Sequence, residues 1–288
     1  MENLQSALVL HGGAGACSPA HLQRLKKELK AVLRKAKTLK ESALLLEASG
    51  AFNCGSGGST TSEGAVENEC CLMESTGEFS ALCIIPRGVS PYEALQEQIG
   101  KSARPGAVRP LCTAYAPHTP KESPRSETFF AEKAESEAAD TVGVIQVQKG
   151  HISAYSSSGG PVRKTPGRIG PCSVYGANTF VSEGAAVLVS GTGESLIRQQ
   201  LARRILEAAE TWDFESVKEE LEKFVRREKE FPHVGGVCVL SRQEKVYIVH
   251  FQTAASFVFG YSFQGRCTVV GHAQKRGAVY LDVLCMGN

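Results

Sequence analysis

The sequence predicts an α+β protein in which helices and mostly antiparallel sheets form separate layers. Strand-like runs come in clusters, and the last cluster covers 235–240, 245–251 and 256–263. The amphipathic, helix-like regions are grouped in the same way and do not lie between single strands. Because alternating strands and helices are typical of a parallel sheet, clustered elements favour stacked layers. The sequence has no internal repeat.

The first part of the chain begins with a strand and a long amphipathic region. The apolar run 7–11 leads directly into Gly12-Gly13-Ala14-Gly15. Over 19–46, leucines and valines recur at steps of three and four, which predicts one helix. Basic residues over 24–40 have no aromatic residues among them, so we interpret them as a solvated helix face rather than a nucleic-acid site.

A glycine-rich loop, two strands and a short helix are expected next. Residues 49–62 are rich in Gly, Ser, Thr and Asn, which indicates a tight loop. We expect strands at 66–73 and 79–85, and a helix at 91–99 with a proline at its start. The span 101–140 contains five prolines and many charged and small residues, so we expect it to be flexible for much of its length.

Regular structure is expected to resume abruptly at 141. The alternating run 141–147 predicts a strand that turns at Lys149-Gly150 and returns through 152–155 as a hairpin. A loop rich in Gly and Pro at 159–171 then leads to an apolar strand at 185–190. After it, an amphipathic region from 194 to about 229 predicts two helices, which are broken near Trp212-Asp213.

The composition is ordinary for a soluble globular protein. Hydrophobic residues make up 42% and charged residues 22%, and 32 basic against 30 acidic residues give a net charge of +2. This balance gives no reason to expect nucleic acid or a membrane as a partner. The start of the chain lacks a secretion signal, and the apolar runs are too short to span a bilayer. We therefore expect an intracellular protein, cytoplasmic, nuclear or both.

Ten cysteines could indicate disulfides or a zinc site. The closest pair, Cys70-Cys71, is adjacent and is not spaced like a pair of metal ligands. Most of the others lie in apolar runs, where free cysteine behaves as a small buried hydrophobe. We interpret them as reduced core residues and expect no metal and no cofactor.

The junction between Asp140 and Thr141 has two interpretations. It is either a linker between two domains or a cleavage site. A chain that begins at Thr141 would carry a hydroxyl and a free α-amine on one residue. With an ordinary pKa near 8, that amine can accept the proton of the hydroxyl at neutral pH, so no histidine is required.

Three polar, glycine-containing loops favour the cleavage site. Ser156-Ser157-Ser158-Gly159-Gly160 closes the hairpin that starts at Thr141, so its hydroxyls can lie beside the nucleophile. Ser190-Gly191-Thr192-Gly193-Glu194 joins a strand to a helix, and amides exposed at such a turn can hold an oxyanion or a carboxylate. Asn53-Cys54-Gly55-Ser56-Gly57 offers a side-chain amide.

Together, in this order, these motifs identify a resemblance. The chain resembles the type-2 asparaginase (isoaspartyl peptidase) superfamily of N-terminal nucleophile hydrolases and, within it, the threonine aspartase (taspase) branch. The matching motifs are His11-Gly-Gly-Ala-Gly15, Asn53-x-Gly-x-Gly57, Asp140-Thr-Val-Gly143, Ser157-Ser-Gly-Gly160, Lys164-x-Pro-Gly-Arg-Ile-Gly170, Ser190-Gly-x-Gly-Glu194 and Gly235-Gly236. They cover nearly the whole chain apart from 101–140, and the C-terminal Arg276-Gly277-Ala278-Val279 resembles taspase more than asparaginase.

This resemblance implies a four-layer αββα sandwich. A precursor would be cut into an α part, 1–140, and a β part, 141–288, which stay together as one composite domain. Two such αβ units usually pair as a dimer. The resemblance also implies the roles of single residues: Thr141 as nucleophile, Ser158 as its supporting hydroxyl, Ser190 and Gly191 as the oxyanion or substrate-gripping pair, Asn53 as an assisting amide, and Arg168 with the nearby Gly193 as the substrate-binding group.

Two departures separate protease from amidase. Where asparaginases place an aspartate for the substrate's α-ammonium, this chain has Pro171. Where asparaginases have glycine before the nucleophile, this chain has Asp140, as taspases do. The chain is therefore predicted to cleave protein substrates after Asp, with Arg168 binding that carboxylate. The alternatives are an L-asparaginase or isoaspartyl dipeptidase of the same family, and an unprocessed, non-enzymatic scaffold.

Overall fold

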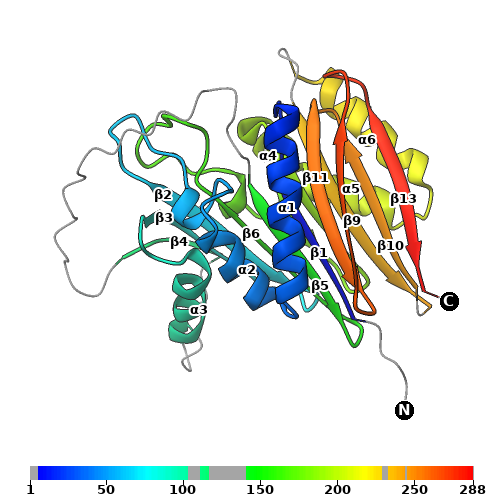
Figure 1. The fold of residues 1–288 in the computed structure, drawn as a ribbon, viewed down its shortest axis with the longest axis horizontal. Coiled ribbons are helices and arrows are strands. Elements are labelled where there is room, and N and C mark those ends of the chain that lie inside the picture. Colours follow the sequence, from blue (N-terminus) through cyan, green and yellow to red (C-terminus); the bar gives the residue numbers. More distant parts are fainter. Residues whose placement is uncertain (1–5, 103–110, 117–140, 229–232, 244, 288) are drawn as a thin grey trace.

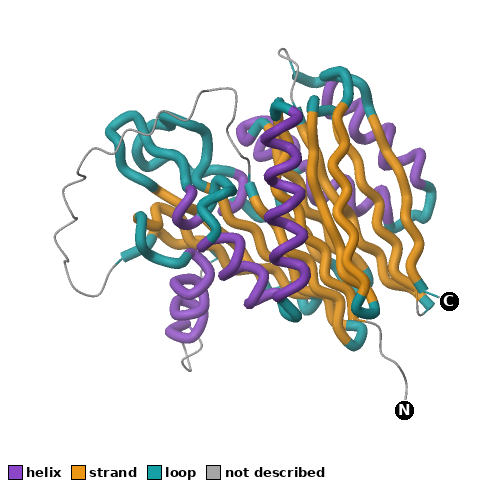
Figure 2. Tube along the Cα trace, in the orientation of Figure 1, coloured by secondary structure: helices purple, strands orange, loops and turns teal. Residues whose placement is uncertain are grey.

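The computed structural model describes residues 6–102, 111–116, 141–228, 233–243 and 245–287. They form a mixed α/β protein with two sheets, as Figure 1 and Figure 2 show. Six α-helices lie in these ranges: α1 (Pro19–Lys35), α2 (Leu39–Ala48), α3 (Pro91–Ser102), α4 (Gly193–Gln199), α5 (Leu201–Ala209) and α6 (Phe214–Arg226). No helix in the described part of the chain is long and apolar enough to cross a membrane.

The larger sheet has eight strands, and all neighbours are antiparallel except β3 and β4. In order across the sheet they are β12 (Arg266–Ala273), β11 (Ser256–Phe263), β1 (Ser6–Gly15), β5 (Val142–Gln148), β6 (His151–Ser158), β2 (Glu67–Glu74), β3 (Phe79–Pro86) and β4 (Cys112–Ala114). β1 pairs with both β11 and β5. The first strand of the chain therefore holds the C-terminal part beside the strand that follows Thr141.

The smaller sheet has five strands, all antiparallel to their neighbours. They are β13 (Tyr280–Met286), β10 (Lys245–Gln252), β9 (Val234–Arg242), β8 (Ala185–Gly191) and β7 (Thr179–Val181). The predicted predominance of antiparallel pairing is thus confirmed.

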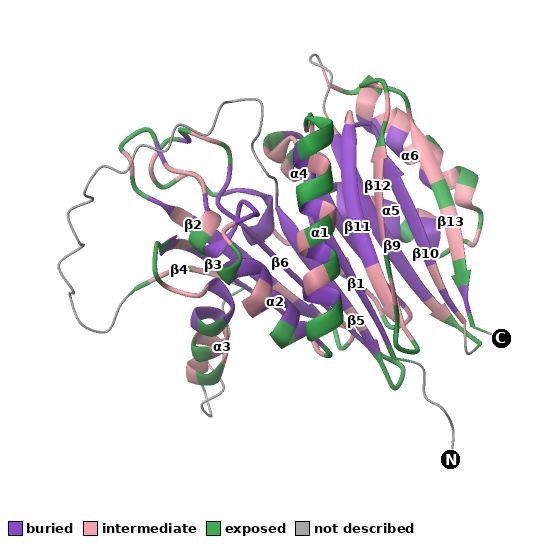
Figure 3. Cartoon of the chain, in the orientation of Figure 1, coloured by how far each residue is buried: buried purple, intermediate pink, exposed green. Residues whose placement is uncertain are grey.

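Both faces of the larger sheet are buried, which explains why its central strands are apolar at successive positions. On β1, Leu8 and Leu10 belong to the core formed with α1, α2 and α3, whereas Ala7 and Val9 belong to the core shared with the smaller sheet. This division follows from the alternation of side chains along a strand. Figure 3 shows the outer side of α1 exposed and the strands beneath it buried.

The smaller sheet divides its side chains in the same way. On β8, Leu188 packs into the core between the two sheets, whereas Val187 packs into a third core with Leu206 of α5 and Leu221 of α6. The described helices therefore cover one face of each sheet, and the other two faces pack against each other.

The helix expected over 19–46 is in fact two helices. α1 ends at Lys35, and Thr38 begins α2 by accepting a hydrogen bond from the backbone N–H of Glu41 at 3.2 Å. The Glu41 side chain in turn accepts from the backbone N–H of Lys37 at 2.6 Å. A Thr followed three residues later by Glu is a helix-start signal, which the hydrophobic periodicity had masked.

The region after β8 contains three helices where two were expected. The predicted break near Trp212-Asp213 is confirmed, since Trp212 has a φ of 63° and Asp213 caps α6. A second break lies at Gln200, whose φ of 46° ends α4. No Gly or Pro signals this break. The strands β7, β12 and β13 were also not predicted.

The span 101–140 is only partly described. Lys101 and Ser102 end α3, and Cys112–Ala114 form β4 beside β3, so these residues are regular where flexibility was expected. Residues 103–110 and 117–140, including Asp140 of the expected cleavage site, lie outside the described residues. None of the ten cysteines, all of them within the described residues, is in a disulfide bond; six are buried as predicted, whereas Cys285 is exposed.

Glu47, at the end of α2, is a buried carboxylate that joins several elements. It accepts hydrogen bonds from Ser90 Oγ at 2.7 Å, from the backbone N–H of Tyr92 at 3.1 Å and from the Tyr155 hydroxyl. Its own carbonyl accepts from Ser56 Oγ at 2.8 Å, in the glycine loop. Burial raises the pKa of Glu47 to about 7, although these hydrogen bonds act in the opposite direction.

This raised pKa predicts a pH-dependent stability. In the unfolded chain the pKa returns to its usual value of 4.5, so the folded chain binds the proton more tightly. The stabilisation is complete below the unfolded pKa and is lost as the pH rises through the folded one. We expect the free energy of unfolding to fall by about 3 kcal/mol across that interval.

The Glu47→Gln variant should lack this fall, because an amide does not titrate. Urea denaturation across the interval measures the difference between variant and parent, with Glu28→Gln on α1 as control. If the free energy of unfolding fell equally with rising pH in the parent and in Glu47→Gln, Glu47 would not be the group responsible.

Candidate active site

Thr141 immediately precedes β5 and lies opposite Ser158 on β6. The register pairs Val142 with Ser157, which places Thr141 across from the next residue, Ser158. The Thr141 hydroxyl donates a hydrogen bond to Ser158 Oγ at 3.1 Å. Because Val142 and Val144 pack toward the helices, Thr141 points to the opposite face, on the side of the smaller sheet.

Asn53 fixes the loop that follows Ser158. Its side-chain Nδ2 donates to the carbonyl of Gly160 at 2.7 Å, and its backbone carbonyl accepts from the N–H of Gly159 at 2.8 Å. The N–H of Gly160 donates to Ser158 Oγ at 3.0 Å. Ser158 thus accepts two hydrogen bonds, one of them from Thr141, and keeps its own proton for a further acceptor.

Thr141 and Ser158 border a cavity of about 470 Å³. This volume is suited to a small ligand or a peptide side chain. Its lining consists of Gly15, Ala16, Asn53, Thr141, Ser158, Gly160, Pro161, Val162, Arg168, Pro171, Gly193, His233, Ala255 and Arg276. Among the described residues, the side chains of this lining thus include two guanidinium groups and no carboxylate.

Arg168 is the lining residue best placed to bind a carboxylate. Its Nε and Nη2 donate to one oxygen, Oε1, of Glu194 at 2.9 and 2.7 Å. A Cβ on Gly193 would lie 2.5 Å from Arg168 Nη2 and 3.1 Å from Pro171 Cδ. A side chain at position 193 would therefore displace the guanidinium where it passes the start of α4.

Ser190 and Gly191 do not line this cavity. Ser190 is buried at the end of β8, and its Oγ accepts from the N–H of Ala14 at 3.3 Å. Gly191 has a φ of 156°, and a Cβ there would lie 2.1 Å from the carbonyl oxygen of His233. The structure thus brings Thr141, Ser158, Asn53, Arg168 and Gly193 to the cavity and places this expected pair behind its wall.

Two buried ionisable residues, Glu69 and Lys164, lie close to Arg168. A bulge in β3 at Ile84, which has a φ of 59°, sets two residues opposite Glu69. Glu69 accepts from the N–H of Gly170 at 2.5 Å, and burial raises its pKa although the charges of Lys164 and Arg168 oppose this. Lys164 donates to the carbonyl of Glu67, and burial lowers its pKa.

Neither nearby histidine forms a triad with Thr141. His11 is buried next to Gly143, and burial lowers its pKa to about 3, so the ring is neutral at physiological pH. His233 lines the cavity, and its pKa is lowered first by burial and then by the charge of Arg276. Ser158 is the partner that the structure gives to the Thr141 hydroxyl. Among the described residues, no group of three or more His, Cys, Asp and Glu side chains could hold a metal.

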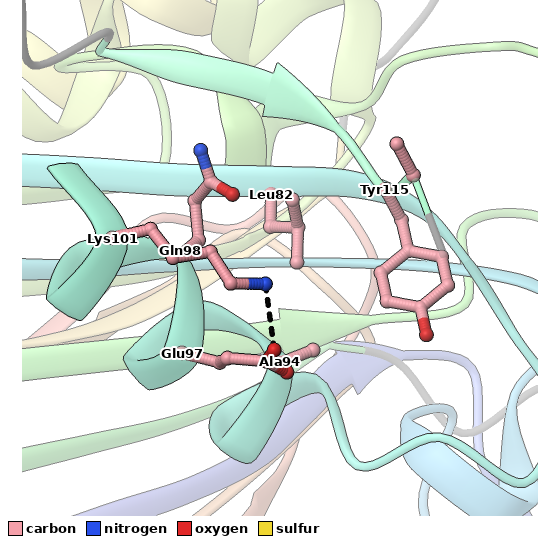
Figure 4. A pocket seen from close by; sticks show the side chains of 7 residues that line it. Leu82, Ala94, Glu97, Gln98, Lys101 and Tyr115 are labelled. Carbon is pink, nitrogen blue, oxygen red and sulfur yellow. Dashed lines mark ion pairs between the residues drawn. The ribbon is translucent and has the colours of Figure 1, made fainter. Parts of the chain in front are cut away.

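A second cavity, of about 40 Å³, lies between α3 and the end of β4. Lys101 Nζ pairs with Glu97 Oε1 at 2.6 Å. Figure 4 shows this pair among the side chains that line the cavity, with Leu82 and Tyr115. This cavity is too small for a substrate, and it has no nucleophile.

Several residues of the site had no role in the sequence interpretation. Glu194, Lys164 and Arg276 stood in the matching motifs, but their contacts join segments that are far apart in the sequence. Glu194 meets Arg168 across 26 positions. His233 belonged to no motif, and no signal in the sequence could have placed it at the cavity.

Comparison with known proteins identifies relatives over most of the chain. A family model described as asparaginase (Asparaginase_2) matches residues 111–266, just over half of the chain. An isoaspartyl peptidase of Salmonella typhimurium is 27% identical over 236 residues, covering 67% of this chain and 75% of that protein. A plant-type L-asparaginase of Pyrobaculum calidifontis is 29% identical over 262 residues, covering 77% and 86%. An isoaspartyl peptidase of Escherichia coli is 27% identical over 274 residues, covering 81% and 84%.

The contact between Gly193 and Arg168 predicts a binding defect. In Gly193→Ala, the added methyl group should displace the guanidinium and lower the affinity for a small carboxylate such as succinate by about tenfold. Titration calorimetry measures this affinity. Gly100→Ala is the matched control, because a Cβ there meets nothing within 4 Å. Equal succinate affinity in Gly193→Ala and in the parent would show that Arg168 does not hold the carboxylate.

Proposed function

This chain belongs to the type-2 asparaginase family of hydrolases, and we propose that it is an autoprocessing threonine endopeptidase that cleaves proteins after Asp. The observation that carries the proposal is the cavity in which the Thr141 hydroxyl, held by Ser158, shares a wall with Arg168. A nucleophile and a carboxylate-binding group thus border the same small space.

Self-cleavage would start at the peptide bond between Asp140 and Thr141. The Thr141 hydroxyl attacks the carbonyl of Asp140, the acyl group moves from nitrogen to oxygen, and water hydrolyses the resulting ester. The products are a carboxylate on Asp140 and a free α-amine on Thr141. That amine, with an ordinary pKa near 8, then serves as the base for the hydroxyl of its own residue.

Turnover of a protein substrate repeats this chemistry. The amine takes the proton of the hydroxyl, Thr141 attacks the scissile carbonyl, and the same proton is passed to the leaving amine. Water then hydrolyses the acyl-enzyme ester. Ser158 accepts from the Thr141 hydroxyl and so orients it, and its own proton can be donated to the α-amine.

Ser190 and Gly191 remain our proposed oxyanion pair. The Ser190 hydroxyl accepts from Ala14, so its own proton is not used in that bond. A small opening of the wall beside Gly15 and Gly193 would bring this donor to the cavity. Preorganised donors of this kind stabilise the charge of the tetrahedral intermediate.

The lining of the cavity supports an internal aspartyl residue as the substrate. Arg168 can bind its side-chain carboxylate. The resemblance to asparaginases implies that Pro171 replaces the charged partner of a free amino acid's α-ammonium, and none of the described residues that line the cavity has a carboxylate. An internal residue of a protein has no α-ammonium and does not need such a partner.

The second candidate is an isoaspartyl peptidase or L-asparaginase. The relatives, which are isoaspartyl peptidases and an L-asparaginase, support this activity better than the endopeptidase. Its substrate also carries a carboxylate for Arg168, but it adds an α-ammonium. A third possibility, an uncut scaffold without activity, would appear as one band on a denaturing gel, whereas the processed enzyme would give two.

We also propose how the layers of the fold, the two parts of the cleaved chain and the dimer are arranged. The three cores support a four-layer αββα sandwich, made of an α part over 1–140 and a β part over 141–288 that remain together after cleavage. Two αβ units would pair as a dimer.

Autoproteolysis is the first expected outcome. Mass spectrometry of the purified chain should find a fragment that begins Thr-Val-Gly-Val-Ile, and Thr141→Ala should remain one chain because its side chain has no hydroxyl. A wild-type protein that keeps its full-length mass during long incubation, as the Thr141→Ala chain is expected to, would exclude self-cleavage.

Substrate choice separates the two enzymatic candidates. An Asn before the scissile bond offers Arg168 no charge, and a missing charged pair between substrate and enzyme of this kind costs roughly 2–5 kcal/mol, which corresponds to more than tenfold in rate. We expect cleavage of Asp-Gly peptides, little cleavage of Asn-Gly controls and negligible ammonia release from asparagine. Brisk asparagine hydrolysis without peptide cleavage would favour the asparaginase instead.

A further inference from the structure

Glu194 binds the Arg168 guanidinium, which is the group that the proposed substrate needs. Arg168 directs both Nε and Nη2 to a single oxygen of Glu194, at 2.9 and 2.7 Å. The Arg168 side chain is 16% exposed and lines the cavity, whereas the Glu194 side chain is 59% exposed and lies outside the lining. A carboxylate from the protein thus contacts the guanidinium at the mouth of the candidate site.

A second glutamate lies on the inner side of the same guanidinium. A Cβ on Gly170 would be 2.2 Å from Glu69 Oε1 and 2.7 Å from Arg168 Nη1, so these two atoms lie within 5 Å of each other. Glu69 is 1% exposed, and its Oε1 has no hydrogen-bond partner among the described residues. Glu69 is therefore held beside Arg168 by its burial, whereas the exposed side chain of Glu194 can turn into solvent.

The geometry of the outer pair favours exchange with a ligand. Glu194 offers Arg168 one oxygen, whereas an incoming carboxylate can offer two and form parallel hydrogen bonds. The released Glu194 side chain regains water, because most of its surface is already solvated. The positive charge of Arg168 is paired with Glu194 before the exchange and with the ligand carboxylate after it.

From this arrangement we infer that Glu194 is an internal competitor, which occupies the carboxylate-binding face of Arg168 until a substrate carboxylate displaces it. The inference rests on the proposed function, since it assigns the occupant of the proposed substrate-binding group. Glu194 would thereby determine how tightly any aspartyl ligand binds, because each ligand must first break the Arg168–Glu194 pair.

The Glu194→Gln variant tests this inference. Gln keeps the shape of the side chain and removes its charge, so the competitor is weakened without a change in packing. Titration calorimetry at low salt should show N-acetyl-L-aspartate binding roughly two- to fivefold more tightly to the variant than to the wild type, the range expected for an exposed ion pair. Glu207→Gln, in the exposed pair with Arg203 on α5, should bind as the wild type does.

L-aspartate, titrated in parallel, separates a competitor from an anchor. It adds an α-ammonium that N-acetyl-L-aspartate lacks. If Glu194→Gln binds both ligands more tightly, Glu194 competes for Arg168. If the variant loses affinity for L-aspartate alone, Glu194 binds the ammonium, which overturns the inference and favours the amidase.

The remaining results are also decisive. Unchanged affinity for both ligands in Glu194→Gln would exclude competition while leaving the proposed function intact. Failure of both ligands to bind either protein would instead remove the carboxylate-binding role of Arg168, and with it the proposed specificity.

Discussion

The hydrogen bond between Thr141 and Ser158 depends on the register between β5 and β6. Both strands lie in the middle of the larger sheet, and both faces of that sheet are buried. A shift of one residue would turn every side chain of β5 to the other face and place the Thr141 hydroxyl among the leucines of α1 and α2. The packing of the two cores therefore fixes the direction in which Thr141 points.

Several features maintain this register. The turn at Lys149-Gly150 has φ values of 53° and 79°, which suit a tight hairpin between twisted strands. On the other side, β1 pairs with β5 so that His11 lies opposite Gly143, and a Cβ at Gly143 would be 2.3 Å from the His11 ring. A glycine two residues after Thr141 thus allows β1 to approach β5 closely.

The position of Arg168 in the candidate site depends on the loop between β6 and β7. Asn53 holds the start of this loop through Gly160, and buried Glu69 holds it again at Gly170. Arg168 lies between these two anchors. Ser158, the hydrogen-bond partner of Thr141, and Arg168 are therefore joined by a short segment that is fixed at both ends, which supports the proposal that Thr141 and Arg168 act on one substrate.

The sequence predicted the central hairpin well, because alternating apolar residues and a glycine turn are local signals. Motif order also brought Thr141, Ser158 and Arg168 together. The break at Gln200 was missed because neither Gly nor Pro marks it, and β12 and β13 were missed because edge strands bury few side chains. The pairing of Arg168 with Glu194 could not be predicted, since it requires knowing how the loop folds back onto α4.

We propose that Thr141 acts as an N-terminal nucleophile, in which the hydroxyl and the released α-amine work together. The most direct measurement is mass-spectrometric mapping of the adduct formed with an aspartyl peptide epoxyketone, an electrophile that closes a ring with the hydroxyl and the amine of one N-terminal residue. We expect a single adduct, on Thr141, the first residue of the fragment that self-cleavage releases. An adduct on another residue, or none on a chain that cleaves Asp peptides, would contradict this proposal.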